Sequence, residues 1–295
     1  MKIAVVTDSS AGFSKEEEKL YPNLRVIQIP FFVNDKEYIE GETMSREEFF
    51  QSLDDNNTEV HTSQPTIATI TNVWDNLLET YDYIIHIPLS SALSSSYNTA
   101  QMLSNDEEYL GKVFAVDCQR VSFSQKLSVL EALIMIKEGF SVREIIDYLI
   151  KTKFDSSIYI NVPSLKYLKK GGRLTKRVAL IGTLLQIKPV LQIQGEKLDT
   201  YKKAHSIKQC YQIQIKALKD DLENRFKDYL LKNEMVLAIA YTDNLDEALK
   251  MKEMMHKEFP NLKIKVFDKL CLTISCHIGR GCLGVGLARI RSELM

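Results

Sequence analysis

The chain has 295 residues, a length that suits one large domain or two of ordinary size, and its 45% hydrophobic content argues against disorder. Its 38 Lys and Arg residues balance 39 Asp and Glu residues, so no basic excess indicates a nucleic-acid groove or a polybasic membrane anchor. The apolar runs are too short to span a bilayer, and residues 1–8 lack the long apolar region of a signal peptide. We therefore expect a soluble, cytoplasmic protein with no nucleic-acid partner.

Strand-like and helix-like segments alternate along the first half of the chain. We expect strands at 3–6, 25–33, 37–39, 83–87 and 113–116, and helices at 14–20, 45–53, 67–78, 94–103, 124–138 and 141–151. Three of these helices begin with Ser followed three residues later by Glu, the capping-box spacing, at positions 14, 45 and 141. Residues 34–36 predict the turn of a hairpin. Strands separated by helices indicate an α/β domain with a parallel, Rossmann-like sheet that is covered on both faces.

The second half changes to an α+β pattern. We expect a strand at 157–162, a short helix at 164–170, an antiparallel hairpin of 189–193 with 198–202, one long helix at about 207–231, and a strand–helix–strand unit at 236–241, 245–259 and 263–267. Residues 178–185 are apolar nearly all round, which predicts a buried helix or the wall of an apolar tunnel. We place the domain boundary near residue 155, with an α/β domain at 1–155 and an α+β domain at 156–295.

The five cysteines are odd in number and contain no Cys-x-x-Cys pair, so a disulfide framework is not expected. Cys276, His277 and Cys282 lie close together in the sequence, but no fourth ligand has the spacing of a metal site. We therefore expect buried, reduced thiols, with no metal and no cofactor.

Three hydroxyl-rich runs, at 7–10, 62–65 and 90–96, each follow an apolar segment. Loops that leave the strands of a parallel sheet gather along one edge, where ligands usually bind. Hydroxyls and helix-start amides suit a small anion that is held by neutral donors. Each run could also be an ordinary helix cap, so the combination of the three favours one shared site.

His277 precedes the glycine-rich stretch 279–284, which matches Gly-x-Gly-x-x-Gly. Too few residues follow Gly284 to complete a dinucleotide-binding unit, so we expect a tight turn that fixes the imidazole as a donor to an anion. His61 and His86 lie close to the hydroxyl-rich runs and are weaker candidates to adjust the site. Residues 169–173, Lys-Lys-Gly-Gly-Arg, are either a capped helix end or a basic loop that meets an acidic partner or a phosphate.

Taken in order, six segments resemble the DegV family of bacterial fatty-acid-binding proteins. They are TDSS at 7–10, TSQPT at 62–66, IPLSSALSSSY at 87–97, LKYLKKGGRL at 165–174, IGTLLQIKPVL at 181–191 and HIGRGCLGVG at 277–286. Each segment alone is weak evidence for the family, but the occurrence of all six in order over nearly the whole chain makes the resemblance specific. The chain departs from the family pattern at Ser95, where Gly is usual, and at Arg280, where Pro is usual. Arg280 either adds a cation near the carboxylate or is exposed on the surface.

The resemblance implies two domains with one long-chain fatty acid between them. The residues implied for the carboxylate are Thr62, Ser94 and His277, with Ser63 and Ser95 in the head-group region. The acyl chain would enter the second domain near 180–185 and 189–191. Burying sixteen carbons would contribute roughly 12 kcal/mol before ordering costs, at about 0.8 kcal/mol per CH₂.

The resemblance also implies a carrier without catalytic residues of its own. A separate kinase, related to dihydroxyacetone kinases, would phosphorylate the bound fatty acid to acyl phosphate for phospholipid synthesis. Arg173 would face this kinase or the new phosphate, and the scheme allows transient contact with a membrane surface.

Two other classes of function stay open from the residues themselves. A hydrolase or transferase acting on a small acyl or phosphoryl substrate would pair a hydroxyl nucleophile with His277, and would need Asp8 or Asp117 to orient the imidazole. A sensor of small anions would have the polar site without the apolar tunnel.

Overall fold

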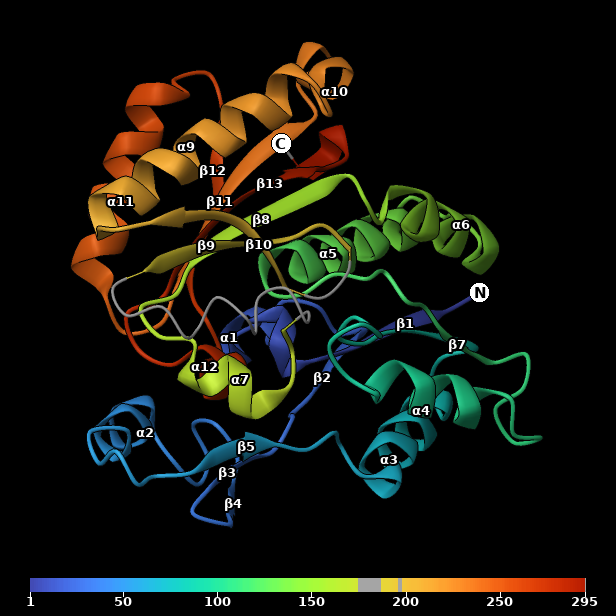
Figure 1. The fold of residues 1–295 in the computed structure, drawn as a ribbon. Helices are drawn as coiled ribbons and strands as arrows, with labels where there is room; N and C mark the ends of the chain where they lie inside the picture. Colours follow the sequence, from blue (N-terminus) through green and yellow to red (C-terminus); the bar gives the residue numbers. More distant parts are fainter. Residues whose placement is uncertain (175–186, 196–197, 295) are drawn as a thin grey trace.

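The first half of the chain forms a parallel sheet covered by helices on both faces. The computed structural model describes residues 1–174, 187–195 and 198–294 (Figure 1). The sheet has the order β2-β1-β6-β7, from β1 (Ile3–Asp8), β2 (Leu24–Ile27), β6 (Tyr83–Ile87) and β7 (Val113–Ala115). Helices α3 (Ile67–Leu78) and α4 (Ser96–Ser104) pack on one face, and α5 (Phe123–Lys137) and α6 (Val142–Thr152) pack on the other.

Strand β1 shows why both faces are covered. Its successive side chains point to opposite faces, so Ala4 and Val6 pack under α3 and α4 while Ile3 and Val5 pack under α5 and α6. All four side chains are apolar and buried. The predicted parallel sheet with two covered faces is confirmed.

A small antiparallel sheet, of order β4-β3-β5, lies beside the parallel one. It consists of β3 (Phe31–Val33), β4 (Lys36–Tyr38) and β5 (Val60–Thr62), and it is accompanied by η1 (Ser9–Ala11), α1 (Lys15–Lys19) and α2 (Arg46–Ser52). The single extended segment expected at 25–33 is wrong, because β2 and β3 belong to different sheets and Pro30, which has no N–H, separates them. The hairpin is confirmed, with Asn34 and Asp35 at φ 49° and 62° as a two-residue turn requires.

The helix starts follow the sequence signals closely. Capping boxes form at Ser14, Ser45 and Ser141, where each Ser side chain accepts from the backbone N–H of the Glu three residues later. These three predictions are confirmed.

The second half forms a six-stranded mixed sheet of order β10-β9-β8-β13-β11-β12. Its strands are β8 (Ser156–Asn161), β9 (Lys188–Ile193), β10 (Asp199–Ala204), β11 (Met235–Tyr241), β12 (Ile264–Lys269) and β13 (Leu283–Arg289). Strands β11 and β12 are parallel, and the other neighbouring pairs are antiparallel. Strand β13 was not expected from the sequence, yet it lies in the middle of the sheet.

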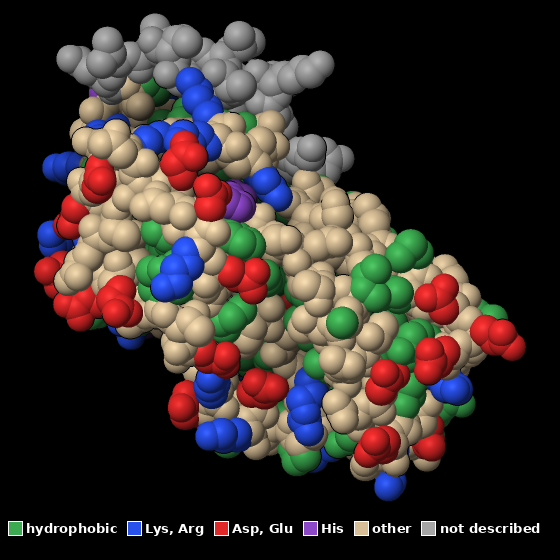
Figure 2. All heavy atoms as spheres, turned by 90° about the horizontal axis from the view of Figure 1, so that it is seen from below, with side chains coloured by type: hydrophobic (Ala, Val, Ile, Leu, Met, Phe, Trp, Pro, Cys, Tyr) green, Lys and Arg blue, Asp and Glu red, His purple; other side chains and the backbone are tan. Residues whose placement is uncertain are grey.

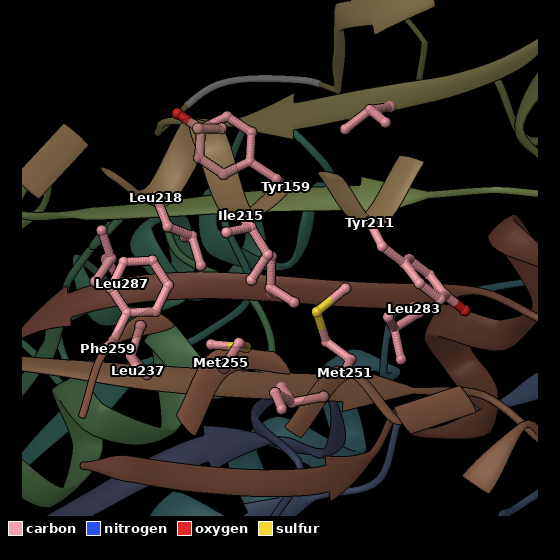
Figure 3. Close-up of a cluster of buried hydrophobic side chains, with 14 of the residues drawn as sticks. Tyr159, Tyr211, Ile215, Leu218, Leu237, Met251, Met255, Phe259, Leu283 and Leu287 are labelled. Carbon is pink, nitrogen blue, oxygen red and sulfur yellow. The ribbon is translucent and has the colours of Figure 1, made fainter. Parts of the chain in front are cut away.

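Two helices cover the outer face of this mixed sheet. Helices α9 (Ile207–Glu223) and α11 (Leu245–Glu258) pack on it through a large apolar cluster, to which α11 contributes Met251 and Met255 and the sheet contributes Leu237 and Leu287 (Figure 3). The single helix expected at about 207–231 is wrong. It is broken into α9 and α10 (Lys227–Leu231) because Phe226 turns into the core, where it is 2% exposed.

The remaining described elements are α7 (Lys166–Gly171), α12 (Leu272–Ile278) and η2 (Ser292–Leu294). Helix α12 belongs to the second half of the chain but packs against the small sheet of the first half, where Leu272 and Cys276 contact a cluster that contains Phe31 and Phe49. The strands of the parallel sheet end at residue 115 and those of the mixed sheet begin at 156, which supports the domain boundary near 155; the boundary stays a prediction. The helix predicted at 178–185 lies outside the described residues.

The distribution of charge on the surface agrees with the near-equal numbers of acidic and basic residues. On the face shown in Figure 2, Lys and Arg side chains are interspersed with Asp and Glu side chains. Within the described ranges, no helix combines the length and apolarity needed to cross a membrane.

Candidate functional site

A cavity of about 400 Å³ lies between the two halves of the chain. Its apolar wall comes from both halves and includes the inner face of the mixed sheet: Ile29, Leu89, Leu93, Val121, Phe123, Ile158, Ile160, Leu168, Ile193, Leu198, Ala240, Leu270, Ile274 and Ile278, with Gly284. Its polar lining residues are Thr62, Ser63, Gln64, Ser94, Ser95, Ser122, Arg173, Thr273 and His277. The volume falls in the range of about 300–1,000 Å³ that is usual for small-molecule sites.

The end of β5 and the end of α12 meet at this cavity. Thr62 Oγ1 lies 2.9 Å from His277 Nε2, although the two residues are 215 positions apart. The helix-cap alternative is wrong for Thr62 and Ser63, because Thr66 caps α3 by accepting from the N–H of Thr69. Thr62 and Ser63 are therefore free to face the cavity.

The run at 90–96 serves both as a helix start and as a cavity wall. Ser94 Oγ accepts from the N–H of Ser96 at 3.2 Å and lies 2.9 Å from Ser96 Oγ. Ser95 makes no capping bond with its side chain. Ser94 and Ser95 both line the cavity, and Ser94 at the same time hydrogen-bonds the backbone at the start of α4.

The run at 7–10 does not line the cavity, and the expectation that all three runs share one site is wrong for it. Its side chains bond inside the fold instead, because Asp8 accepts from the N–H of Leu89 at 2.7 Å and Ser9 Oγ accepts from the N–H of Ile29 at 3.1 Å. Burial raises the pKa of the Asp8 carboxyl. Leu89 and Ile29 line the cavity, so the hydrogen bonds from this run hold two residues of the cavity wall in place.

His277 is held as a neutral imidazole. Burial, and to a smaller extent the nearby positive charge of Arg173, lowers its pKa to about 4. A Cβ placed on Gly171 would lie 2.4 Å from His277 Nδ1, so the last turn of α7 packs directly on the ring. The other ring nitrogen, Nε2, is the one that meets Thr62. This glycine contact was not expected from the sequence, where Gly171 was interpreted only as a helix stop.

Arg173 lines the cavity beside this imidazole. Its Nε donates to the carbonyl of Leu93 at 3.2 Å, and its guanidinium also bonds the carbonyl of Gly171. These contacts hold a positive charge at the polar part of the cavity.

The other histidines are not cavity residues. His86 packs edge-on against Trp74, and burial lowers its pKa to about 3. His61 stacks on Phe32 with ring centroids 4.6 Å apart. The suggestion that these two residues adjust the site is not supported by the cavity lining.

The acids considered as partners of His277 bond elsewhere. Asp117 accepts from the N–H of Ser91 at 3.2 Å and from the N–H of Gln119 at 3.0 Å. Asp8 bonds as described above. In the described part of the chain, neither carboxylate is hydrogen-bonded to His277.

Of the two alternatives for Arg280, the exposed position on the surface is the one observed. Arg280 does not line the cavity, and it pairs with Asp54 and Asp243 at the surface. Of the expected tail region, 180–185 lies outside the described residues. The expectation for 189–191 is not met, because Leu191 is fully buried in an apolar cluster and Ile193 lines the cavity in its place.

The cysteine prediction is confirmed, since all five thiols are free and buried. Cys282 Sγ lies against the carbonyl of Ile278. Among the residues that the structure describes, no group of three or more His, Cys, Asp or Glu side chains could hold a metal ion.

Comparison with known proteins agrees with this architecture. A family model described as "Uncharacterised protein, DegV family" matches residues 2–289. The chain belongs to the DegV family. A DegV domain-containing protein of Staphylococcus aureus is 29% identical over 286 residues, which cover 96% of this chain and 98% of that protein.

Solved DegV structures share the fold over almost the entire chain. A fatty acid binding DegV family protein from Streptococcus agalactiae has a TM-score of 0.86 and 25% identity, covering 99% of this chain and 100% of that one. DegV from Bacillus subtilis, a fatty acid binding protein, has a TM-score of 0.82 and 26% identity, covering 98% and 99%. The mixed α/β architecture is therefore shared with these solved DegV structures.

Proposed function

We propose that this DegV chain binds one long-chain fatty acid in the cavity between its two halves. The observation that carries the proposal is the lining itself, in which hydroxyls and one imidazole accompany a long apolar wall. The similar structures from Streptococcus agalactiae and Bacillus subtilis, both named as fatty acid binding, support the same ligand class.

In this proposal, Thr62, Ser94 and His277 hold the carboxylate, with Ser63 and Ser95 beside them. Neutral donors suit this role, because a buried carboxylate is costly unless it is hydrogen-bonded. Before a ligand binds, its pKa of about 4 leaves His277 uncharged at neutral pH, so the imidazole meets the carboxylate as a neutral donor. Arg173 adds one positive charge nearby.

The tail lies along the inner face of the mixed sheet in this proposal. Ile158, Ile160 and Ile193 supply branched apolar side chains to the wall. Each buried CH₂ contributes about 0.8 kcal/mol, so the tail supplies most of the affinity and the polar residues orient the head group.

The chain would then act as a carrier with no catalytic residue of its own. It would present the carboxylate to a separate dihydroxyacetone-kinase-like kinase, and the acyl phosphate would feed phospholipid synthesis. Arg173 is the residue that we assign to the kinase or phosphate contact, because its guanidinium lies at the polar part of the cavity.

The binding proposal is tested with protein purified from bacteria. Native mass spectrometry followed by organic extraction should find one acyl chain per protein, and purified apo-protein should bind palmitate or oleate. Thr62→Ala and Ser94→Ala should weaken binding more than Thr71→Ala, whose side chain bonds within α3 and does not line the cavity. Repeated preparations without lipid and without palmitate binding would refute the proposal.

One observation favours a hydrolase or transferase as the second candidate. The 2.9 Å contact between Thr62 Oγ1 and His277 Nε2 has the geometry of a nucleophile and its base. Hydrolysis of acyl esters by the purified chain, abolished by Thr62→Ala, would favour this enzyme. Binding of palmitate without turnover would favour the carrier.

A further inference from the structure

The turn that follows α12 has an ion-pair arrangement of its own. Gly279 and Gly281 have φ of 76° and 69°, and they reverse the chain between α12 and β13. Arg280 stands at the tip of this turn, three positions after His277. Its side chain reaches two other segments of the chain.

The Arg280 guanidinium bonds two carboxylates and covers one ring. Its Nε donates to Asp243 Oδ2 at 2.8 Å, and its Nη1 pairs with Asp54. The guanidinium carbon lies 5.8 Å from the ring centroid of Phe50, a cation–π distance. Asp243 also accepts from the N–H of Gly281 at 2.7 Å, so the turn is held by its backbone as well.

The two carboxylates belong to different halves of the chain. Asp243 follows β11 of the mixed sheet, and Asp54 follows α2, which packs on the small sheet. Phe49 of α2 meets Phe31 of β3 with ring centroids 5.5 Å apart, and β3 pairs with β5. Asp54 is therefore joined to the sheet that carries Thr62.

We propose that Arg280 is a positioning residue for His277, acting by tying the end of α12 to the unit that carries Thr62. The pair with Asp54 spans the same two halves as the bond between Thr62 and His277. This inference rests on the proposed function, since Arg280 would affect how tightly the carboxylate of the fatty acid is bound. It assigns no contact between Arg280 and the ligand.

A single exposed ion pair contributes little to the stability of a protein, typically less than about 1 kcal/mol. The Arg280 arrangement differs because one planar guanidinium serves two carboxylates and an aromatic face. Although burial opposes it, the hydrogen bonds from Arg280 and from the N–H of Gly281 lower the pKa of Asp243. Asp54 remains exposed, so its pair should respond to salt.

The test compares Arg280→Ala, Asp54→Ala and Arg280→Lys with wild type in the full chain. Arg143→Ala is the matched control, because Arg143 also forms an exposed ion pair, with Asp147 on α6. Palmitate affinity is measured at low and high NaCl, and the side-chain pKa of His277 is followed by nitrogen-15 NMR, with His277→Gln to assign the signal. Thermal unfolding confirms that each variant is folded.

We expect Arg280→Ala and Asp54→Ala to weaken palmitate binding about twofold to fivefold at low salt, with a smaller difference at high salt. Water entering beside α12 should raise the pKa of His277 from about 4 toward its ordinary 6.5. Arg280→Lys should restore part of the affinity, and Arg143→Ala should change neither readout.

The outcomes separate this inference from the proposed function. Unchanged palmitate affinity and unchanged His277 pKa in Asp54→Ala, with palmitate bound by wild type, would overturn the role of Arg280 alone. Absence of palmitate binding in wild type would overturn the proposed function, and the His277 titration would still decide whether Arg280 positions the imidazole.

Discussion

Replacing Gly171 by Ala tests the packing of the binding site with one methyl group. Gly171 ends α7 without a left-handed φ, so Ala causes no backbone strain there, and any loss of stability comes from the contacts of the added methyl group. The added Cβ would lie 2.4 Å from His277 Nδ1, about 1 Å closer than ordinary contact. The imidazole must move, because the helix backbone holds the methyl in place.

A shift of this size breaks the 2.9 Å contact between His277 Nε2 and Thr62 Oγ1. The displaced imidazole also loses its hydrogen bond to the proposed carboxylate. A hydrogen bond to a charged group is worth about 1.5–3 kcal/mol, so palmitate should bind about tenfold to a hundredfold more weakly. Isothermal titration with palmitate measures the affinity, and urea unfolding measures the stability.

Gly172→Ala is the control for Gly171→Ala. Gly172 has φ of 68°, and a Cβ there meets nothing within 4 Å. This variant should lose about 1–2 kcal/mol of stability through backbone strain and should keep its affinity for palmitate. Wild-type affinity in Gly171→Ala, or equal losses of affinity in both variants, would contradict the assigned packing of His277.

Three further predictions follow from the same cavity. Ser94→Ala should weaken palmitate binding about threefold to tenfold, the typical worth of one hydrogen bond, while Thr71→Ala should not; equal effects in titration calorimetry would contradict the head-group assignment. Gly284→Ala should fold normally, because a Cβ there has ordinary contacts of 3.6 Å or more, and should weaken the binding of palmitate more than that of decanoate, since it narrows the apolar slot; identical losses for both acids would argue against a tail at this wall. Stability should be highest above pH 6.5 and fall toward pH 4, because the unfolded chain takes up the His277 proton before the folded one does. In His277→Gln, the free energy of unfolding measured with urea should fall less steeply with decreasing pH than in wild type, and the contribution of His86 is common to both proteins. Parallel curves of stability against pH would count against a desolvated imidazole at position 277.

Local signals in the sequence were sufficient for most elements of the first half. A Ser with a Glu three residues later marks a helix start through contacts inside one turn, and the helices at 14, 45 and 141 begin as predicted. The alternation of strands and helices similarly indicated the parallel sheet. These features depend on neighbours in the sequence.

Elements that depend on distant contacts were missed. Strand β13 contains Gly284 and Gly286, which obscure its strand pattern, yet a Cβ on Gly286 would lie 2.2 Å from the Phe123 ring. Helix α12 has no capping bond from a side chain at Cys271, and its packing on the small sheet stabilises it instead. The break between α9 and α10 also follows from packing, that of Phe226.

Some residues of the candidate site could be found from the sequence, and others only from the structure. The resemblance to the DegV family pointed to Thr62, Ser94 and His277, and the structure lines one cavity with all three. Gly171 gave no distinguishing signal, because Gly172 beside it already accounts for a helix stop. Only the close approach of the ring shows why the first glycine is needed.

The position of β13 has a consequence for biosynthesis. This strand comes last among the described strands but lies between β8 and β11, and α12 with His277 directly precedes it. Ribosomes deliver the N-terminal part first, so the parallel sheet can form while the mixed sheet still lacks its centre. The wall of the cavity is therefore incomplete in a nascent chain until β13 has emerged, so the cavity can close only after nearly all of the described residues have been made.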